Sequence, residues 1–147
     1  MTKYLGVFVP DTDLAVAVNK TLREIILLLR RVSADSTITA PQLAVLGSLA
    51  DGSRRMSELA AEHGVRMPTM TTQINRLERD GLVARGGDAS DARVVTAALT
   101  ESGRTALEAG RAQRVEYLAE RLAALSAADR EAIAAALPAL SRLSKGE

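Results

Sequence analysis

Polar and cationic side chains recur at helical spacing between residues 66 and 80, opposite a row of apolar ones. At about 100° per residue, one face of the predicted helix holds Met67, Met70, Ile74 and Leu77. The other face carries hydroxyls, an amide and guanidinium groups but no carboxylate, a combination that suits a phosphate-lined groove. The residues of this outward face are Pro68, Thr69, Thr72, Asn75, Arg76 and Arg79.

These side chains have specific uses in nucleic-acid binding. Threonine can hydrogen-bond a phosphate or place its methyl group against thymine, and Arg76 can pair bidentately with guanine. The alternative interpretation is a solvated helix face with isolated arginines. With the neighbouring Arg66 and Gln73 included, the candidate DNA contacts of this segment are Arg66, Pro68, Thr69, Thr72, Gln73, Asn75, Arg76 and Arg79.

A short alternating stretch follows Gly81, which ends the helix. The segments "LVAR" and "RVVTAAL" predict two strands, joined by the polar turn "GGDASDA". Arg93 comes just after the tip, and Asp88 or Asp91 can pair with Arg93 or Arg85 and fix the direction of a guanidinium group. Asp91 and Arg93 are therefore further candidate DNA contacts, because an arginine here can enter a narrow minor groove. The alternative is a solubilising loop.

Two more candidate contacts, Arg54 and Arg55, lie earlier in the chain, before the short helix predicted at "ELAAEHG", where they either touch phosphates or are solvated. His63 is the single histidine and lies beside Gly64 at a predicted helix end, where the helix dipole favours a cation. With one histidine, no cysteine and no glycine-rich phosphate loop, the sequence carries no catalytic constellation, disulfide or metal site. We expect a protein that is not an enzyme and that binds no metal or cofactor.

The elements that position these residues follow from hydrophobic spacing and capping signals. The acidic run "DTD" at residues 11–13 can cap a first helix, which becomes apolar nearly all round between Ile25 and Leu29. A second helix starts at Thr39 with Pro41. In so small a chain, a second subunit is the expected cover for the apolar stretch of the first helix.

Four further elements complete the order. Ser57 is the predicted N-cap of a short helix that Gly64 closes, and a tight turn then leads to the helix of residues 66–80. After the hairpin, Thr100 can cap a long helix, while Ser126 with Asp129 starts a last helix that Pro138 kinks or ends. Two short helices joined by a tight turn form a helix-turn-helix, and a hairpin directly after it makes a winged helix.

Composition sets the class of protein. The 147 residues correspond to about one domain. Of 19 basic residues only Lys3, Lys20 and Lys145 are lysine, either because arginine pairs better with phosphate and guanine or because the genome is GC-rich. The apolar run "YLGVFV" near the N-terminus is too short for a signal peptide, and "IILLL" at 25–29 cannot span a bilayer. A cytoplasmic, soluble protein without a membrane partner is expected.

The segment from Ser57 to Gly103 resembles the MarR family of bacterial transcriptional regulators. The family pattern has a "P-T" helix start, "L-E-x-x-G-L-V-x-R", a wing "D-x-x-D-x-R" and "L-T-x-x-G". The matching residues here are Pro68-Thr69, Leu77-Glu78, Gly81-Leu82-Val83, Arg85, Asp88, Asp91, Arg93, Leu99-Thr100 and Gly103. Two departures are Ala92, where many relatives carry a second basic residue, and the "YLGVFV" extension, which is not part of the shared pattern.

The resemblance implies a homodimer whose first helix and last two helices form the dimerisation region. It implies that each recognition helix enters a major groove of double-stranded DNA, that Arg93 enters the flanking minor groove, and that a small acidic or aromatic effector relieves binding. The expected fold is mainly α with a small β-wing: a winged helix-turn-helix at 37–100, flanked by an N-terminal segment and first dimerisation helix at 1–36 and by dimerisation helices at 101–147. The expected partner is a pseudo-palindromic operator.

Two functions of different class are compatible with these residues. The first is a dimeric, sequence-specific DNA-binding transcriptional regulator, a repressor that a small-molecule ligand releases. The alternative is a winged-helix module that binds another protein without direct DNA readout. Steep salt dependence of DNA binding separates the two, because only phosphate contacts release counterions. The sequence leaves the operator, the regulated genes and the ligand-binding residues open.

Overall fold

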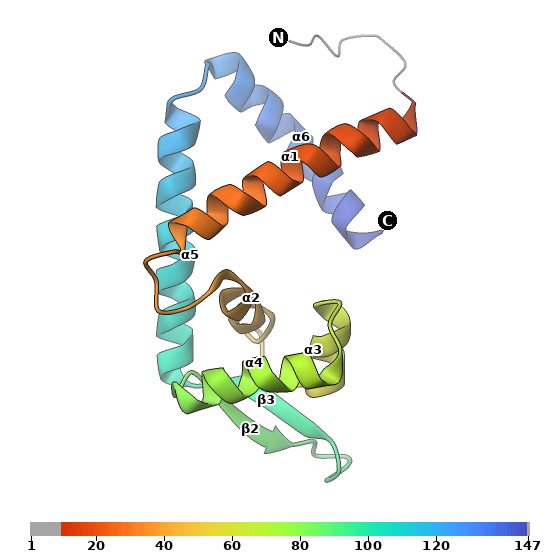
Figure 1. The fold of residues 1–147 in the computed structure, drawn as a ribbon, viewed down its shortest axis with the longest axis vertical. Coiled ribbons are helices and arrows are strands. Elements are labelled where there is room, and N and C mark those ends of the chain that lie inside the picture. The colour runs from red at the N-terminus through yellow and green to blue at the C-terminus, as the bar shows by residue number, and fades with distance from the viewer. Residues whose placement is uncertain (1–9, 147) are drawn as a thin grey trace. The chain divides into compact units, whose positions relative to one another are not determined.

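The computed structural model describes residues 10–146 and has the predicted order of helices with a hairpin between the fourth and fifth (Figure 1). The apolar "YLGVFV" extension lies outside the described residues. One short strand, β1, was not predicted. The elements are α1 (Asp11–Val32), α2 (Ala40–Ser48), β1 (Arg54–Arg55), α3 (Met56–Glu62), α4 (Met67–Arg79), β2 (Val83–Gly87), β3 (Val95–Leu99), α5 (Glu101–Ala123) and α6 (Ala127–Lys145).

The chain forms two compact units, each of which has most of its contacts within itself. The first extends to Glu108 and the second begins at Ala109, so the boundary falls inside α5. The winged helix-turn-helix belongs entirely to the first unit. No helix in the described part of the chain is long and apolar enough to cross a membrane.

Three of the predicted helix starts are confirmed by hydrogen bonds of a hydroxyl group at the N-cap. The Thr39 hydroxyl accepts from the Gln42 amide at 3.3 Å, and the Gln42 side chain accepts from the Thr39 amide at 2.9 Å. Thr100 accepts from the Gly103 amide at 3.0 Å, and Ser126 accepts from the Asp129 amide at 3.1 Å. Each cap satisfies a backbone N–H that has no partner within its helix.

The prediction that Ser57 caps α3 is wrong. The helix begins two residues earlier than such a cap requires, at Met56, and the N-cap residue is Arg55. Arg55 is also the last residue of β1, so the strand leads directly into the helix and leaves no place for a separate hydroxyl cap. Instead, the Glu58 carboxylate accepts from the Arg55 amide at 3.3 Å.

Two further details of the helix ends differ from expectation. Pro10 is the N-cap of α1 and no side chain caps it, so Asp11 and Asp13 lie within the first turn, where the helix dipole favours carboxylates. Pro138 does not end α6, which continues to Lys145. A proline inside a helix lacks the N–H for one backbone hydrogen bond, and α6 tolerates this loss.

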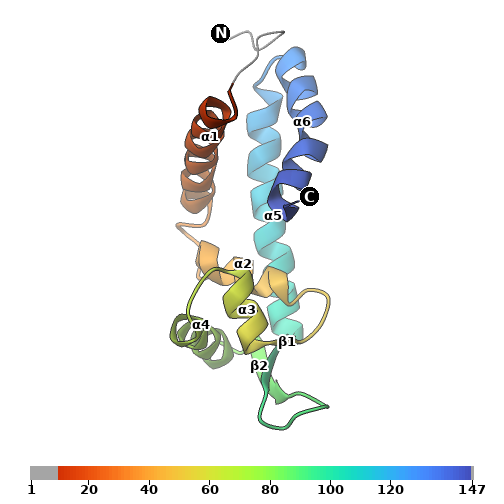
Figure 2. The same cartoon turned by 90° about the vertical axis from the view of Figure 1, so that its right-hand side faces the viewer.

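A small antiparallel sheet in the order β1-β3-β2 supports the wing. In the register, Arg55 lies opposite Thr96 of β3, and Thr96 lies opposite Gly86 of β2. The β2–β3 hairpin extends beyond α4 in both views of the fold (Figures 1 and 2). The prediction of a winged helix-turn-helix is therefore confirmed, with β1 as an added edge strand.

The core of the first unit lies between α2, α3, α4, the sheet and the start of α5. Its side chains are almost all aliphatic, and each contributes roughly 1.5–3 kcal/mol on burial of a leucine-sized group. The largest of those with essentially no exposed surface are Leu46, Leu49, Leu59, Met70, Ile74, Leu77 and Val45. Because three of these residues belong to α4, the orientation of that helix is set by the core.

Gly103 allows α5 to approach the segment that joins α4 to β2. A Cβ atom at this position would lie 1.9 Å from the Leu82 carbonyl oxygen, and that oxygen already accepts from the Thr100 amide at 3.1 Å. Thr100 also donates its hydroxyl proton to the Gly81 carbonyl at 2.6 Å. The start of α5 and the end of α4 are thus joined through backbone atoms that cannot move aside.

We expect Gly103→Ala to lower the free energy of unfolding by about 1–3 kcal/mol or more, because the added methyl group meets backbone and not a flexible side chain. Chemical denaturation followed by circular dichroism measures this change. Ser102→Ala, at the exposed neighbouring position of the same helix, is the matched control. A Gly103 variant as stable as the Ser102 variant would contradict the close approach.

Candidate nucleic-acid interface

Helix α4 has the two faces that the sequence predicts. Met70, Ile74 and Leu77 have no exposed surface, whereas the six residues of the predicted outward face are all exposed. Met67 differs from the other apolar residues of the helix, because 44% of its surface is exposed. Arg66 is the N-cap residue, with Pro68 in the first turn. The core therefore holds the inner face, and the polar face is turned to solvent.

The hydroxyl of Thr72 is already used as a donor. It donates to the Pro68 carbonyl at 3.0 Å, one helical turn earlier. In this rotamer the oxygen retains only its acceptor capacity, so it cannot donate to a phosphate. What Thr72 presents outward is therefore an acceptor and a methyl group, which fits apolar contact with thymine better than phosphate binding.

Asn75 is held by an arginine of the wing. Arg85, on β2, donates to the Asn75 Oδ1 atom at 2.6 Å, and another nitrogen of Arg85 lies 3.9 Å from the Glu78 carboxylate. Arginine has donors only, so the amide of Asn75 must turn its oxygen to Arg85. The amide nitrogen of Asn75 then remains for another partner. Arg85 does not pair with Asp88 or Asp91, the two partners that the sequence suggests for it.

The remaining candidate residues of α4 differ in exposure and in whether they have a partner within the protein. Arg76 is exposed and forms no ion pair or side-chain hydrogen bond within the described residues. Arg79 is also exposed, and its Nε atom lies 3.6 Å from the Asp80 carboxylate. Gln73 is half-buried, and its Oε1 atom is buried without a hydrogen-bond partner in residues 10–146. Arg76 is thus the cation of α4 that is most available to a ligand.

At the wing, Asp91 holds Arg93. The Asp91 carboxylate accepts from the Arg93 amide at 3.0 Å, from its Nε at 3.2 Å and from a terminal nitrogen at 3.3 Å. These hydrogen bonds lower the pKa of Asp91. The side chain of Arg93 nevertheless keeps 91% of its surface exposed. The predicted pairing of Asp91 with Arg93 is confirmed, and the guanidinium remains accessible.

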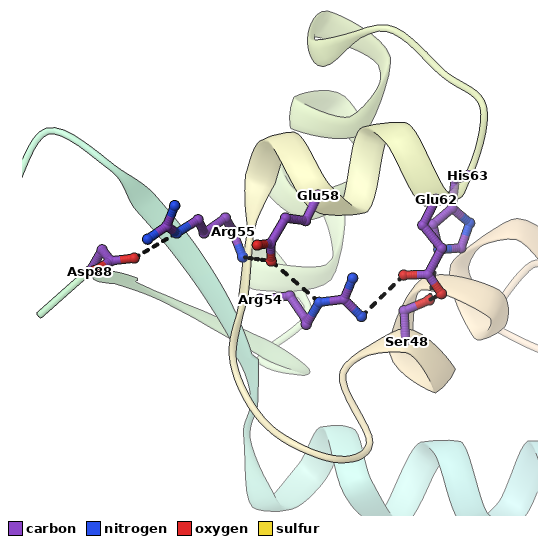
Figure 3. Close-up of polar contacts among 7 residues, drawn as sticks. All are labelled: Ser48, Arg54, Arg55, Glu58, Glu62, His63 and Asp88. Atoms are coloured by element: carbon purple, nitrogen blue, oxygen red, sulfur yellow. Dashed lines mark hydrogen bonds and ion pairs between the residues drawn. The ribbon is translucent and has the colours of Figure 1, made fainter. Parts of the chain in front are cut away.

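The other wing aspartate, Asp88, pairs with Arg55, a partner that the sequence pattern does not indicate. The Arg55 Nε donates to the Asp88 Oδ2 atom at 2.7 Å (Figure 3). The Oδ1 atom accepts from the Ser90 amide at 2.8 Å and from the Ser90 hydroxyl. The Ser90 hydroxyl and amide, followed by the Arg55 guanidinium, lower the pKa of Asp88 from 3.8 to about 2.

Arg54 points to α3 and not to the wing. It lies 3.4 Å from the Glu58 carboxylate and 3.2 Å from that of Glu62, as Figure 3 shows. Glu62 also accepts from the Ser48 hydroxyl at 3.0 Å, and the same hydroxyl lies 2.8 Å from the His63 Nε2 atom. Both arginines of β1 are therefore in intramolecular ion pairs. The sequence predicts only contact with phosphates or exposure to solvent for these two residues.

A hollow of about 490 Å³ opens between the starts of α3 and α4 and strand β3. It combines apolar side chains with the guanidinium groups of Arg85 and Arg93. The sequence pattern assigns Met67 to the apolar face of α4 and Ser57 to a helix cap, and nothing in the pattern indicates that these residues line a common hollow. The lining residues are Met56, Ser57, Met67, Thr71, Arg85, Arg93, Val94 and Val95.

Comparison with known proteins agrees with this geometry. A model of the MarR family matches residues 38–95. The chain is 36% identical over 126 residues to an HTH-type transcriptional regulator of Mycobacterium tuberculosis, covering 85% of each protein. It is also similar to the solved structure of the Multiple Antibiotic Resistance Repressor, MarR, with 26% identity and a TM-score of 0.75 over 92% of this chain and 96% of that one. A Pseudomonas aeruginosa structure is 31% identical, with a TM-score of 0.78 over 93% and 96% of the two chains.

The low pKa of Asp88 predicts a pH dependence of known sign. The charged carboxylate receives the hydrogen bonds, so its contribution to stability is complete above about pH 4 and is lost as the pH falls toward 2. We expect the carboxyl carbon of Asp88 to titrate by NMR near 2, and Ser90→Ala to raise this midpoint. Arg54→Gln is the control, because the Arg54 side chain pairs with Glu58 and Glu62 and not with Asp88. A wild-type midpoint at the ordinary value of 3.8 would contradict the assignment.

Proposed function

This chain belongs to the MarR family of transcriptional regulators, and we propose that it acts as a homodimeric repressor that a small acidic or aromatic effector releases from a pseudo-palindromic operator. The observation that carries the proposal is the outward face of α4. This face is fully exposed and free of carboxylates, on a helix whose opposite face is locked into the core. Such a face fits the major groove of DNA.

The proposed reading heads are α4 and the wing of each subunit. In a two-fold symmetric dimer they contact half-sites about 10 base pairs apart, centre to centre. The 91% exposure of Arg93 supports its insertion into the flanking minor groove, with Asp91 fixing its direction. Arg54 and Arg55, the two candidate contacts before α3, are each paired with a carboxylate and would have to leave it to reach a phosphate.

The hydrogen bond from Arg85 gives Asn75 a defined chemical role in this proposal. A bidentate contact with adenine needs both the oxygen and the nitrogen of the amide. Because the hydrogen bond from Arg85 fixes the amide of Asn75 and leaves Nδ2 for another partner, we propose that the side chain donates through Nδ2 to an acceptor on a base edge, such as adenine N7, guanine O6 or thymine O4. Oδ1 keeps a second lone pair, so the bidentate contact with adenine is also compatible with the hydrogen bond from Arg85.

The proposal also covers the cellular location, the absence of enzymatic activity and the effect of a ligand. We propose that it acts in the cytoplasm, without enzymatic activity or a cofactor, and that the winged helix-turn-helix at residues 37–100 is the DNA-binding part. An effector can change DNA affinity only if it binds one state of the dimer better than another. Release of operator DNA by aromatic acids is the measurement for the effector. A winged-helix module that binds another protein is the competing function.

For the recognition helix, we expect Arg76→Ala to weaken operator binding by about 1–3 kcal/mol and to relax specificity at one base position, if Arg76 reads a guanine. Thr72→Ala should lower affinity by removal of the methyl contact. Fluorescence anisotropy with operator variants, selected first from the organism's own genome with the purified protein, measures both effects. An equal loss on every sequence would assign Arg76 to the phosphates.

The competing function gives different results in the same measurement. Unchanged DNA binding by the Arg76 variant, with little dependence on salt, would favour the protein-binding module.

Exposed apolar side chains on the outer helices support the homodimer. No residue of α1 or α6 is buried within the single chain. The most exposed ones on α1 are Val16, Leu14 and Ile26, at 66%, 50% and 50%, while Leu143 and Leu137 of α6 are 63% and 57% exposed. Patches of this kind on a soluble protein are typical of subunit interfaces.

We expect light scattering to give twice the chain mass of 15.6 kDa at micromolar concentration. Ile26→Glu should shift the protein toward the monomer, because it places a charge inside an interface that excludes water. Lys20→Gln, which makes the same change in net charge at an exposed position about 120° away around the helix, is the control and should leave the dimer intact. A wild-type protein with the mass of one chain would contradict the proposal.

A further inference from the structure

We propose that Arg55 is a positioning residue of the wing: through its ion pair with Asp88 it fixes the base of the loop that presents Arg93, and so sets how strongly the protein discriminates between flanking sequences. The proposal rests on the proposed DNA-binding function. It replaces direct phosphate contact as the role of Arg55 and gives the two wing aspartates different tasks.

The register of the sheet brings Arg55 to the wing. Directly opposed residues of antiparallel strands share a face of the sheet, so Arg55, Thr96 and Gly86 form one row across β1, β3 and β2. Gly86, at the far end of the row, has no side chain to block a long neighbour. Asp88 lies two residues beyond Gly86, and the Arg55 guanidinium reaches its carboxylate at 2.7 Å (Figure 3).

Asp88 closes the base of the wing loop through its backbone amide and both of its carboxylate oxygens. Its amide donates to the Val94 carbonyl at 3.0 Å, which joins the two ends of the loop. One carboxylate oxygen accepts from Ser90 and the other from Arg55. Only 15% of the Asp88 side chain is exposed, against 37% for Asp91. Asp88 is therefore part of the framework, whereas Asp91 contacts the guanidinium of Arg93 directly.

The position of Arg93 depends on this base. Arg93 precedes Val94, the residue to which the Asp88 amide is bonded, and no described contact other than Asp91 restrains its guanidinium. Asp91 is itself in the loop, so it moves with the loop. An unrestrained loop loses more conformational freedom when it binds, and a preorganised one loses less. Arg55 supplies the restraint from β1, an element outside the hairpin.

Arg54 provides a matched control for Arg55. Both residues lie on β1 and carry the same charge, but the side chain of Arg54 pairs with Glu58 and Glu62 of α3 and not with an aspartate of the wing. Long-range attraction of DNA is nearly equal for the two positions. A difference between Arg54→Gln and Arg55→Gln therefore reports the contact with Asp88 and not the loss of a charge.

The experiment compares binding to one operator core with A·T-rich or G·C-rich flanks. We expect Arg55→Gln to reduce the preference for A·T-rich flanks at least about threefold, and Arg54→Gln to preserve it. Asp88→Asn should reduce the preference as Arg55→Gln does, although removal of a negative charge near DNA predicts tighter binding. The double variant should be no worse than either single one, because both remove the same contact.

A second measurement needs no DNA. Hydrogen exchange of the Asp88 and Ser90 amides should become faster in Arg55→Gln and remain unchanged in Arg54→Gln, because these amides bond within the loop base. The outcome of this measurement does not depend on whether the protein binds DNA. Arg55→Lys keeps the charge but not the geometry of the guanidinium group. It should therefore lie between wild type and Arg55→Gln in both measurements, and it provides a second variant in case Arg55→Gln lowers the stability of the fold.

Two results would overturn the proposal. One is equal flank preference and equal amide exchange in Arg54→Gln and Arg55→Gln. The other is a lower salt dependence, by a slope of about 1, in Arg55→Gln with the flank preference unchanged, which would assign Arg55 to a phosphate.

Discussion

Burial of the inner face of α4 is the constraint on which the interface depends. Met70, Ile74 and Leu77 have no exposed surface, so the helix cannot rotate about its axis without opening the core. The same three side chains that stabilise the fold therefore determine which side chains of α4 face the solvent. Thr100 and Gly103 add a restraint at the other end, where backbone atoms of α5 and of the segment after α4 are in direct contact.

The carboxylates near the interface do not lie on the outward face of α4. Glu58 and Glu62 hold Arg54, Asp88 holds Arg55, and Asp91 holds Arg93. At the end of α4, Glu78 lies near Arg85 and Asp80 near Arg79. A net charge of +1 is therefore compatible with DNA binding, because the negative charges serve to direct positive ones. Isolated ion pairs at a surface contribute little stability, so orientation is the main effect of these contacts.

Features that depend on neighbouring residues could be predicted from the sequence. The caps at Thr39, Thr100 and Ser126 and the two faces of α4 are of this kind, as is the pairing of Asp91 with Arg93. Strand β1 could not be predicted, because two residues have no periodicity and their partners on β3 are about forty positions away. The same pairing explains why Ser57 does not cap α3 and why Arg55 meets Asp88.

The scarcity of lysine has a chemical consequence for this surface. Between residues 54 and 93 every permanently charged cation is an arginine, since the three lysines are at positions 3, 20 and 145. Guanidinium groups, unlike the amine of lysine, are not substrates for amine acylation. Acetyl-group transfer to lysine therefore cannot weaken this surface by neutralising it. Ionic strength and competing anions remain as the ways in which its charge can be masked.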